Sequence, residues 1–82
     1  MPRIAIVDGV SIYLYFLDHA PPHFHAIKGD QEAIIQIGGG VLAGSLSRSE
    51  LAKVLEWAET HVDQLNVEWN NGQAGLPIHK IK

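Results

Sequence analysis

The chain has 82 residues, no cysteine, and a net charge of −3 from six Lys and Arg against nine Asp and Glu. A chain of this length supports one hydrophobic core, so we expect a single domain over residues 1–82. The lack of cysteine excludes disulfides and thiolate metal sites, and the acidic balance gives no support to nucleic-acid binding, which relies on basic residues. No apolar run reaches the length of a signal peptide or a membrane span, so we expect a soluble, cytoplasmic protein without membrane contact.

The first half of the chain alternates between hydrophobic and polar residues, which predicts strands. Two dipeptides typical of two-residue hairpin turns, Asp8-Gly9 and Gly29-Asp30, separate such segments, and a run of three glycines, residues 38–40, precedes another. The sequence therefore predicts a five-stranded antiparallel meander within residues 1–46, with strands at residues 3–7, 10–16, 23–28, 31–37 and 41–46.

The second half changes to a helical period. Ser47, with Glu50 three residues later, is typical of a capping box. We expect one long helix over residues 47–75, or a helix broken near residues 60–63 with Asp63 capping a second segment, packed on one face of the sheet in an α+β fold. Residues 76–82 are expected to form a tail laid back on the domain. One helical stripe holds the hydrophobic residues Leu51, Val54, Leu55, Ala58, Val62, Leu65 and Trp69.

The turns also predict which side chains share a face of the sheet. Pairing about Gly29-Asp30 places His25 opposite Ile34 and His23 opposite Gln36, on the face away from the helix. The core face of this second hairpin then holds Phe24, Ala26, Ala33, Ile35 and Ile37. The same reasoning assigns Ala5, Val7, Val10, Ile12, Leu14 and Phe16 of the first hairpin to the core, and Ile4, Ile6, Ser11, Tyr13 and Tyr15 to the reverse face.

Candidate catalytic and metal-ligating side chains are most concentrated in one segment, Asp18-His19-Ala20-Pro21-Pro22-His23-Phe24-His25. Its two prolines stiffen the loop before the third strand, and His23 and His25, two residues apart on a strand, project to one face. Together with His19 and a carboxylate from Asp18 or Glu32, they are candidate ligands for Zn, Ni or Fe. The alternative interpretation is that the histidines are partly buried hydrogen-bonding residues beside a rigid turn.

Paired imidazoles also suit general acid and base catalysis. A hydrolase or metal-independent ribonuclease would act through His19, His23 and His25, with Tyr13, Tyr15 and Lys28 available to an anionic transition state. The acidic composition weighs against this alternative.

The two tryptophans differ in position. Trp69 lies on the apolar stripe and is expected in the core, whereas Trp57 lies on its flank with His61, where a tryptophan either anchors a partner or seals the helix against the sheet. The three glycines join two predicted strands and do not open a helix, so we interpret them as a turn and not a phosphate loop.

Several short segments match the pattern of one family: Asp18-His19-x-Pro21-Pro22-His23-Phe24-His25, Glu32-Ala33, Gly44-Ser45-Leu46, Leu55-Glu56-Trp57-x-x-x-His61, Trp69 and Gly75-x-Pro77. Over nearly its whole length the chain thereby resembles the bacterial domain-of-unknown-function family 4160. The resemblance implies no activity. It implies a genetic context, in which such proteins look like the short partner in two-gene, toxin–antitoxin-like cassettes. The three glycines at 38–40 depart from the family, whose members tend to carry larger residues there.

The leading hypothesis from the sequence is an interaction module that forms a homo-oligomer or binds a small cassette-partner protein. One helix leaves the half-apolar reverse face of the sheet uncovered, and such patches commonly mark interfaces. The runner-up is the histidine-based metalloprotein or hydrolase. The candidate binding residues are Tyr13, Tyr15, Asp18, His19, His23, His25, Glu32, Trp57 and His61.

Overall fold

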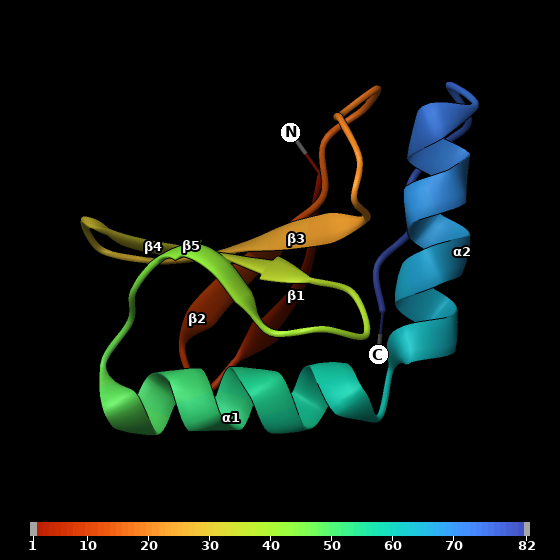
Figure 1. Cartoon of the computed structure of the whole chain (residues 1–82). Coiled ribbons are helices and arrows are strands. Elements are labelled where there is room, and N and C mark those ends of the chain that lie inside the picture. Colours follow the sequence, from red (N-terminus) through yellow and green to blue (C-terminus); the bar gives the residue numbers. More distant parts are fainter. Residues whose placement is uncertain (1, 82) are drawn as a thin grey trace.

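A five-stranded antiparallel sheet is followed by two helices (Figure 1). The structure, a computed structural model, describes residues 2–81. Each strand pairs with its neighbours in the sequence, so the predicted meander is confirmed. The second, fourth and fifth strands end earlier than predicted, at Tyr13, Gln36 and Gly44. The strands are β1 (Arg3–Val7), β2 (Val10–Tyr13), β3 (His23–Lys28), β4 (Gln31–Gln36) and β5 (Val41–Gly44).

Both predicted hairpin turns form. Asp8 and Gly9 have φ values of 51° and 80°, as a type I′ turn requires, and Val7 pairs with Val10 across them. In the second hairpin Lys28 pairs with Gln31. The turns therefore fix the register of both hairpins, as the sequence predicts.

The second hairpin has the predicted faces. His23 pairs with Gln36 and His25 with Ile34, so both histidines lie on the face away from α1. All five residues assigned to the core face are buried: Phe24, Ala26, Ala33, Ile35 and Ile37.

The face assignment in the first hairpin is wrong at two residues. Ile4 was placed on the reverse face, but it is only 1% exposed, because a bulge between Arg3 and Ala5 shifts the register and turns Ile4 into the core. Phe16 was placed in the core but is 49% exposed. The chain leaves β2 after Tyr13, so the alternation of faces does not extend to Phe16.

The helical region is broken near the predicted position. Helix α1 (Arg48–Glu59) lies against one face of the sheet, and helix α2 (Val62–Gln73) stands beside one end of the sheet, at a steep angle to α1 (Figure 1). The capping box at Ser47 is confirmed, since its Oγ accepts from the Glu50 amide at 3.3 Å and donates to Glu50 Oε1 at 2.7 Å. The predicted cap at Asp63 is wrong. His61 occupies the N-cap position but its side chain makes no capping hydrogen bond to α2, and Asp63 lies in the first turn.

The C-terminal segment packs back on the domain, as predicted, over the described residues 76–81. The Ile81 amide donates to the Ile4 carbonyl oxygen at 2.8 Å, and the His79 amide donates to Glu68 Oε1 at 2.7 Å. The final predicted tail residue, Lys82, lies outside the described residues. Neither of the two helices has the length and apolar character needed to cross a membrane.

Candidate functional site

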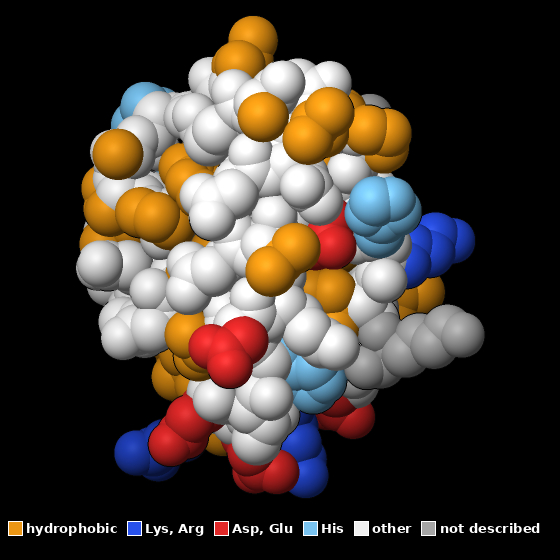
Figure 2. Space-filling model, turned by 90° about the vertical axis from the view of Figure 1, so that its right-hand side faces the viewer, with side chains coloured by type: hydrophobic (Ala, Val, Ile, Leu, Met, Phe, Trp, Pro, Cys, Tyr) orange, Lys and Arg blue, Asp and Glu red, His pale blue; other side chains and the backbone are white. Residues whose placement is uncertain are grey.

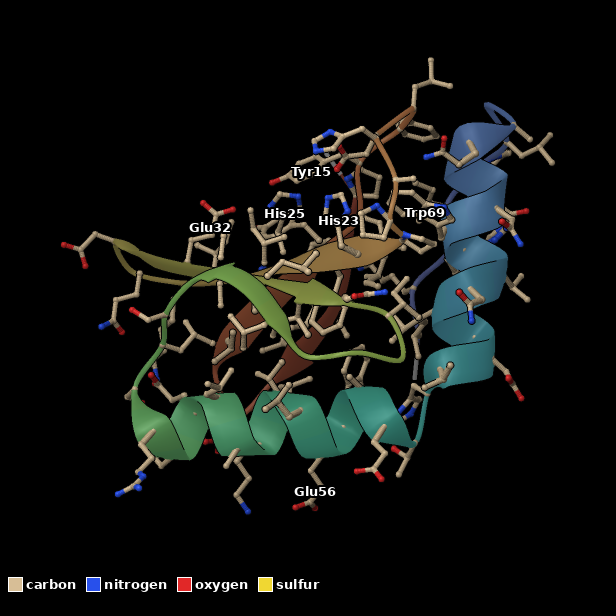
Figure 3. All side chains as sticks on the ribbon, in the orientation of Figure 1. Tyr15, His23, His25, Glu32, Glu56 and Trp69 are labelled. Atoms are coloured by element: carbon tan, nitrogen blue, oxygen red, sulfur yellow. The ribbon has the colours of Figure 1, made fainter. Side chains whose placement is uncertain are left out.

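Three of the predicted site residues converge on the face of the sheet opposite α1. His23 and His25 lie side by side on β3, and Asp18 comes from the β2–β3 loop (residues 14–22). Asp18 Oδ2 is 2.9 Å from His23 Nε2 and 3.5 Å from His25 Nε2. Figure 3 shows both imidazoles above the sheet, with Tyr15 and Trp69 beside them. We call Asp18, His23 and His25 the histidine cluster.

The second nitrogen of each imidazole is held by an acceptor. His23 Nδ1 is 2.7 Å from the Pro21 carbonyl oxygen, and His25 Nδ1 is 2.8 Å from Glu32 Oε2. A carbonyl oxygen and a carboxylate accept hydrogen bonds, so each Nδ1 carries the proton and donates. Both Nε2 atoms face Asp18 Oδ2. Each Nε2 carries a lone pair when its ring is neutral, and donates a proton to Asp18 when its ring is an imidazolium.

The spacing of these atoms fits a metal ion. One ligand atom from each residue of the histidine cluster lies within 4.8 Å of the others. Two ligands that each lie about 2.0–2.2 Å from a tetrahedral zinc ion are about 3.3–3.6 Å apart. The 3.5 Å distance from Asp18 Oδ2 to His25 Nε2 lies within that range, whereas the 2.9 Å distance to His23 Nε2 is shorter, so Asp18 and His23 would have to move apart to admit an ion.

The histidine cluster is largely shielded from solvent. The side chain of His23 is 4% exposed, that of His25 14% and that of Asp18 16%. Water therefore screens the charges in the cluster less than it would at an open surface.

Asp18 is an ionised carboxylate in this setting. Partial burial raises its pKa, but the His19 amide and the neighbouring imidazoles of His23, His25 and His19 outweigh that effect and hold the pKa below its ordinary range. A carboxylate must be deprotonated to bind a metal, so this shift favours ligation near neutral pH.

Two carboxylates, Asp18 and Glu32, contact the imidazoles of the cluster. The pKa of Tyr15 is raised, first by burial and then by the charges of Glu32 and Asp18, with a contribution from Tyr13. Lys28, which a ribonuclease would use against an anionic transition state, instead forms an ion pair with Glu50 of α1.

The remaining predicted residues lie around the cluster or away from it. His19 is 89% exposed and binds the other carboxylate oxygen, with its amide 2.9 Å and its Nδ1 3.1 Å from Asp18 Oδ1. Tyr15 meets His25 edge to face at a ring distance of 4.5 Å, and Tyr13 stacks on Tyr15 at 6.3 Å. His19 and the tyrosines therefore form the rim of the cluster.

Trp57 and His61 are not part of this site. Their rings stack on each other at 4.9 Å, and Trp57 packs edge to face on Phe24 at 6.2 Å, which places the pair on the core side of the sheet. The structure thus matches the interpretation of Trp57 as a residue that seals the helix against the sheet. A binding role for this pair stays a prediction.

Two residues of α2 at the cluster were missed by the sequence analysis. The ring of Trp69 lies 5.2 Å from that of His23, and Gln73 Nε2 donates to the Asp18 carbonyl oxygen at 2.9 Å. The apolar stripe correctly predicts that Trp69 is buried but does not identify its neighbour. Nothing in the sequence marks Gln73, because its contact depends on how α2 turns away from α1.

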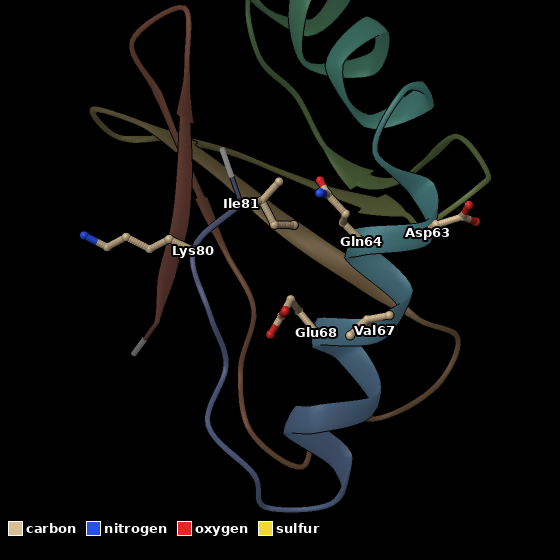
Figure 4. A pocket seen from close by; sticks show the side chains of 6 residues that line it. All are labelled: Asp63, Gln64, Val67, Glu68, Lys80 and Ile81. Atoms are coloured by element: carbon tan, nitrogen blue, oxygen red, sulfur yellow. The ribbon is translucent and has the colours of Figure 1, made fainter.

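A hollow of about 430 Å³ lies elsewhere, between α2 and the C-terminal segment (Figure 4). Its lining includes Glu68, whose carboxylate already accepts hydrogen bonds from the His79 amide and the Asn71 side chain. The hollow is separate from the histidine cluster, because none of its lining residues belongs to the cluster. It is lined by Asp63, Gln64, Val67, Glu68, Lys80 and Ile81.

Comparison with known proteins identifies one family. Residues 9–70, which include the histidine cluster and most of both helices, match the model described as Domain of unknown function (DUF4160). No curated protein and no solved structure matches the chain.

Proposed function

This chain belongs to the DUF4160 family, whose description names no activity, and we propose from the site itself that it is a metal-binding protein. Asp18, His23 and His25 are the proposed ligands, and the proposed ion is divalent, with zinc as the best fit. Nitrogen and carboxylate donors suit zinc, and they also suit the nickel and iron considered from the sequence.

The observation that carries the proposal is the convergence of three electron-pair donors. Because the Pro21 carbonyl and the Glu32 carboxylate hold the Nδ1 protons, both Nε2 atoms and Asp18 Oδ2 point at one another. Such donors repel unless a proton or a metal ion lies between them, and a metal ion is the species that can bind all three at once. Holding the far nitrogen of each ligating histidine is also how proteins orient metal-binding imidazoles, with a backbone carbonyl and a carboxylate as the usual partners.

Three protein ligands leave at least one position of a tetrahedral ion for water or substrate, as in catalytic zinc sites. A bound ion would supply Lewis-acid chemistry there. Tyr15, at the rim of the cluster, and Glu32 both contact His25, so we propose that they would also contact a group bound at that position. A metal-dependent hydrolase is therefore the enzyme class that this site fits.

The test is zinc binding by the untagged protein, measured by calorimetry and by the melting temperature. We expect one ion per chain and a rise in the melting temperature, because an ion that binds only the native state stabilises it by about 2.7 kcal/mol at 100 times the dissociation constant. His23→Ala should lose both effects. His79→Ala is the matched control, since it removes a histidine whose side chain is 67% exposed and which contacts Glu68 instead of the cluster.

Two results would overturn the proposal. One is the absence of stoichiometric zinc, nickel or iron binding below about a millimolar, a concentration at which specific sites are filled. The other is equal zinc binding by the His23→Ala and His79→Ala variants, which would assign the ion to surface histidines.

A second proposed function, self-association, rests on a different observation. Phe16, Leu17 and Leu76 are 49%, 74% and 53% exposed. Backbone hydrogen bonds join Leu17 to Gly72 and Leu76 to Asn71, so these hydrophobic residues gather at the C-terminal end of α2. Figure 2 shows hydrophobic side chains at this end, while most charged side chains gather at the α1 end. A second copy of a chain with net charge −3 meets the least repulsion at such an uncharged end.

Native mass measurement tests this second proposal. We expect a dimer in the wild type, because burying exposed apolar side chains at an interface stabilises the dimer. Leu17→Ser should shift the protein toward monomer. Ile6→Ser is the control, since Ile6 is comparably exposed at 58% but lies on β1. A monomeric wild type, or equal masses for the two variants, would contradict the proposal.

A further inference from the structure

We propose that ion binding at the histidine cluster and docking of α2 are coupled, so that each stabilises the other. This inference rests on the proposed metal site. It adds that the free energy with which α2 docks depends on whether the ion is bound.

Helix α2 contacts the cluster and the segment that carries it at three points. Trp69 packs its ring 5.2 Å from that of the proposed ligand His23. Gln73 Nε2 donates to the Asp18 carbonyl oxygen at 2.9 Å, and the Leu17 amide donates to the Gly72 carbonyl oxygen at 3.3 Å. Two of the three proposed ligands, Asp18 and His23, therefore each contact α2.

We expect the same contacts to stabilise α2 as a helix. Its N-cap residue, His61, makes no side-chain capping bond, and the helix includes residues that disfavour helix formation. Such a helix depends on tertiary contacts for its stability. The unfavourable residues are Asn66, Asn70, Asn71 and Gly72.

Coupling follows from these two facts. An ion that fixes Asp18 Oδ2 against His23 Nε2 also fixes the loop backbone that Gln73 and Gly72 contact, so less ordering remains to be done when α2 docks. Linkage is reciprocal: the factor by which the bound ion favours docking of α2 equals the factor by which docking of α2 raises the affinity for the ion. A variant in which α2 is largely undocked must therefore bind the ion more weakly, by up to that factor.

The test combines calorimetry with amide hydrogen exchange, using zinc as the probe. In the wild type we expect zinc to slow amide exchange both in residues 65–73 of α2 and in residues 17–25. Both segments should reach half of the effect at the same zinc concentration. Gln73→Ala should lower zinc affinity about fivefold or more, although Gln73 contacts only the backbone of Asp18. Gln64→Ala is the matched control, because Gln64 is also an exposed glutamine of α2 but lines the hollow away from the cluster.

The outcomes separate this inference from the proposed function. If zinc binds stoichiometrically but exchange in α2 is unchanged, and Gln73→Ala binds zinc like Gln64→Ala, the coupling is overturned and the metal site stands. If zinc does not bind the wild type at all, the metal site is overturned and the coupling with it. A common midpoint together with a selective loss in Gln73→Ala supports both.

Discussion

Glu32 of β4 holds the imidazole of His25 on β3, with Oε2 2.8 Å from Nδ1. Their strands are neighbours, so this contact sets the orientation of His25 without a long loop. It also leaves Nε2 as the only nitrogen of His25 that is free for a ligand.

The first prediction concerns this contact. Glu32→Ala should weaken zinc binding about 10- to 100-fold, because partners of ligating histidines typically have effects of that size. Glu56→Ala is the control, since Glu56 is an exposed carboxylate of α1 on the far side of the molecule (Figure 3). Calorimetric titration of both variants measures the effect, and equal affinities would show that Glu32 does not orient His25.

The second prediction concerns the two faces of the sheet. Phe24 is fully buried against Trp57, so Phe24→Ala should lower the free energy of unfolding by about 3–5 kcal/mol. Ile6→Ala, at a residue of β1 that is 58% exposed, should cost under about 1 kcal/mol. Urea unfolding gives both values, and similar losses would mean that the core face is assigned wrongly.

The third prediction concerns pH. Partial burial raises the pKa of Glu68, but hydrogen bonds from the His79 amide and Asn71, together with the nearby His79 ring, bring it below its ordinary value of 4.5. A carboxyl group with a lowered pKa in the folded state stabilises the protein above its unfolded pKa, and this contribution is lost as the pH falls through the folded pKa.

Urea unfolding of wild type and Glu68→Gln between neutral and acid pH tests the third prediction. The free energy of unfolding should fall more steeply with acid in the wild type than in the variant. Other groups with shifted pKa values, such as Asp18, are common to both chains and cancel in the comparison. Parallel curves would show that Glu68 does not contribute.

The fourth prediction concerns Gly44, at the end of β5. Its φ is +75°, and a Cβ there would clash with the Glu32 carbonyl oxygen, so Gly44→Ala should destabilise the fold by about 2 kcal/mol or more. Gly40 has open space around it and no positive φ, so Gly40→Ala should change the free energy of unfolding by about 1 kcal/mol at most, in the stabilising direction. Thermal unfolding distinguishes the two variants, and equal melting temperatures would contradict the prediction.

The sequence predicts the parts of the fold that local chemistry determines. Two-residue turns determine which residues pair, and the pairing places His23 and His25 together on one face. The bulge at Ile4 escapes prediction because no turn fixes the register at the far end of β1. Phe16 is misplaced because its strand ends early, which alternation alone does not reveal.

The candidate site was predictable only in part, for a related reason. His23, His25 and Glu32 are brought together by strand pairing, so register arithmetic finds them. Asp18 reaches them through the path of a loop, and Trp69 reaches His23 through the direction that α2 takes after α1. Both depend on tertiary packing, which hydrophobic periodicity does not encode.

The meander order of the sheet has a consequence for folding kinetics. Because every strand pairs with its sequence neighbours, most of the sheet forms by closing short loops, which favours a fast folding reaction. The contact between Ile81 and Ile4 is different, since it joins the two ends of the described chain and closes a very long loop. We therefore expect this segment to dock after the transition state. Ile81→Ala, which removes a buried side chain of the segment, should then speed unfolding in stopped-flow measurements while leaving the folding rate nearly unchanged.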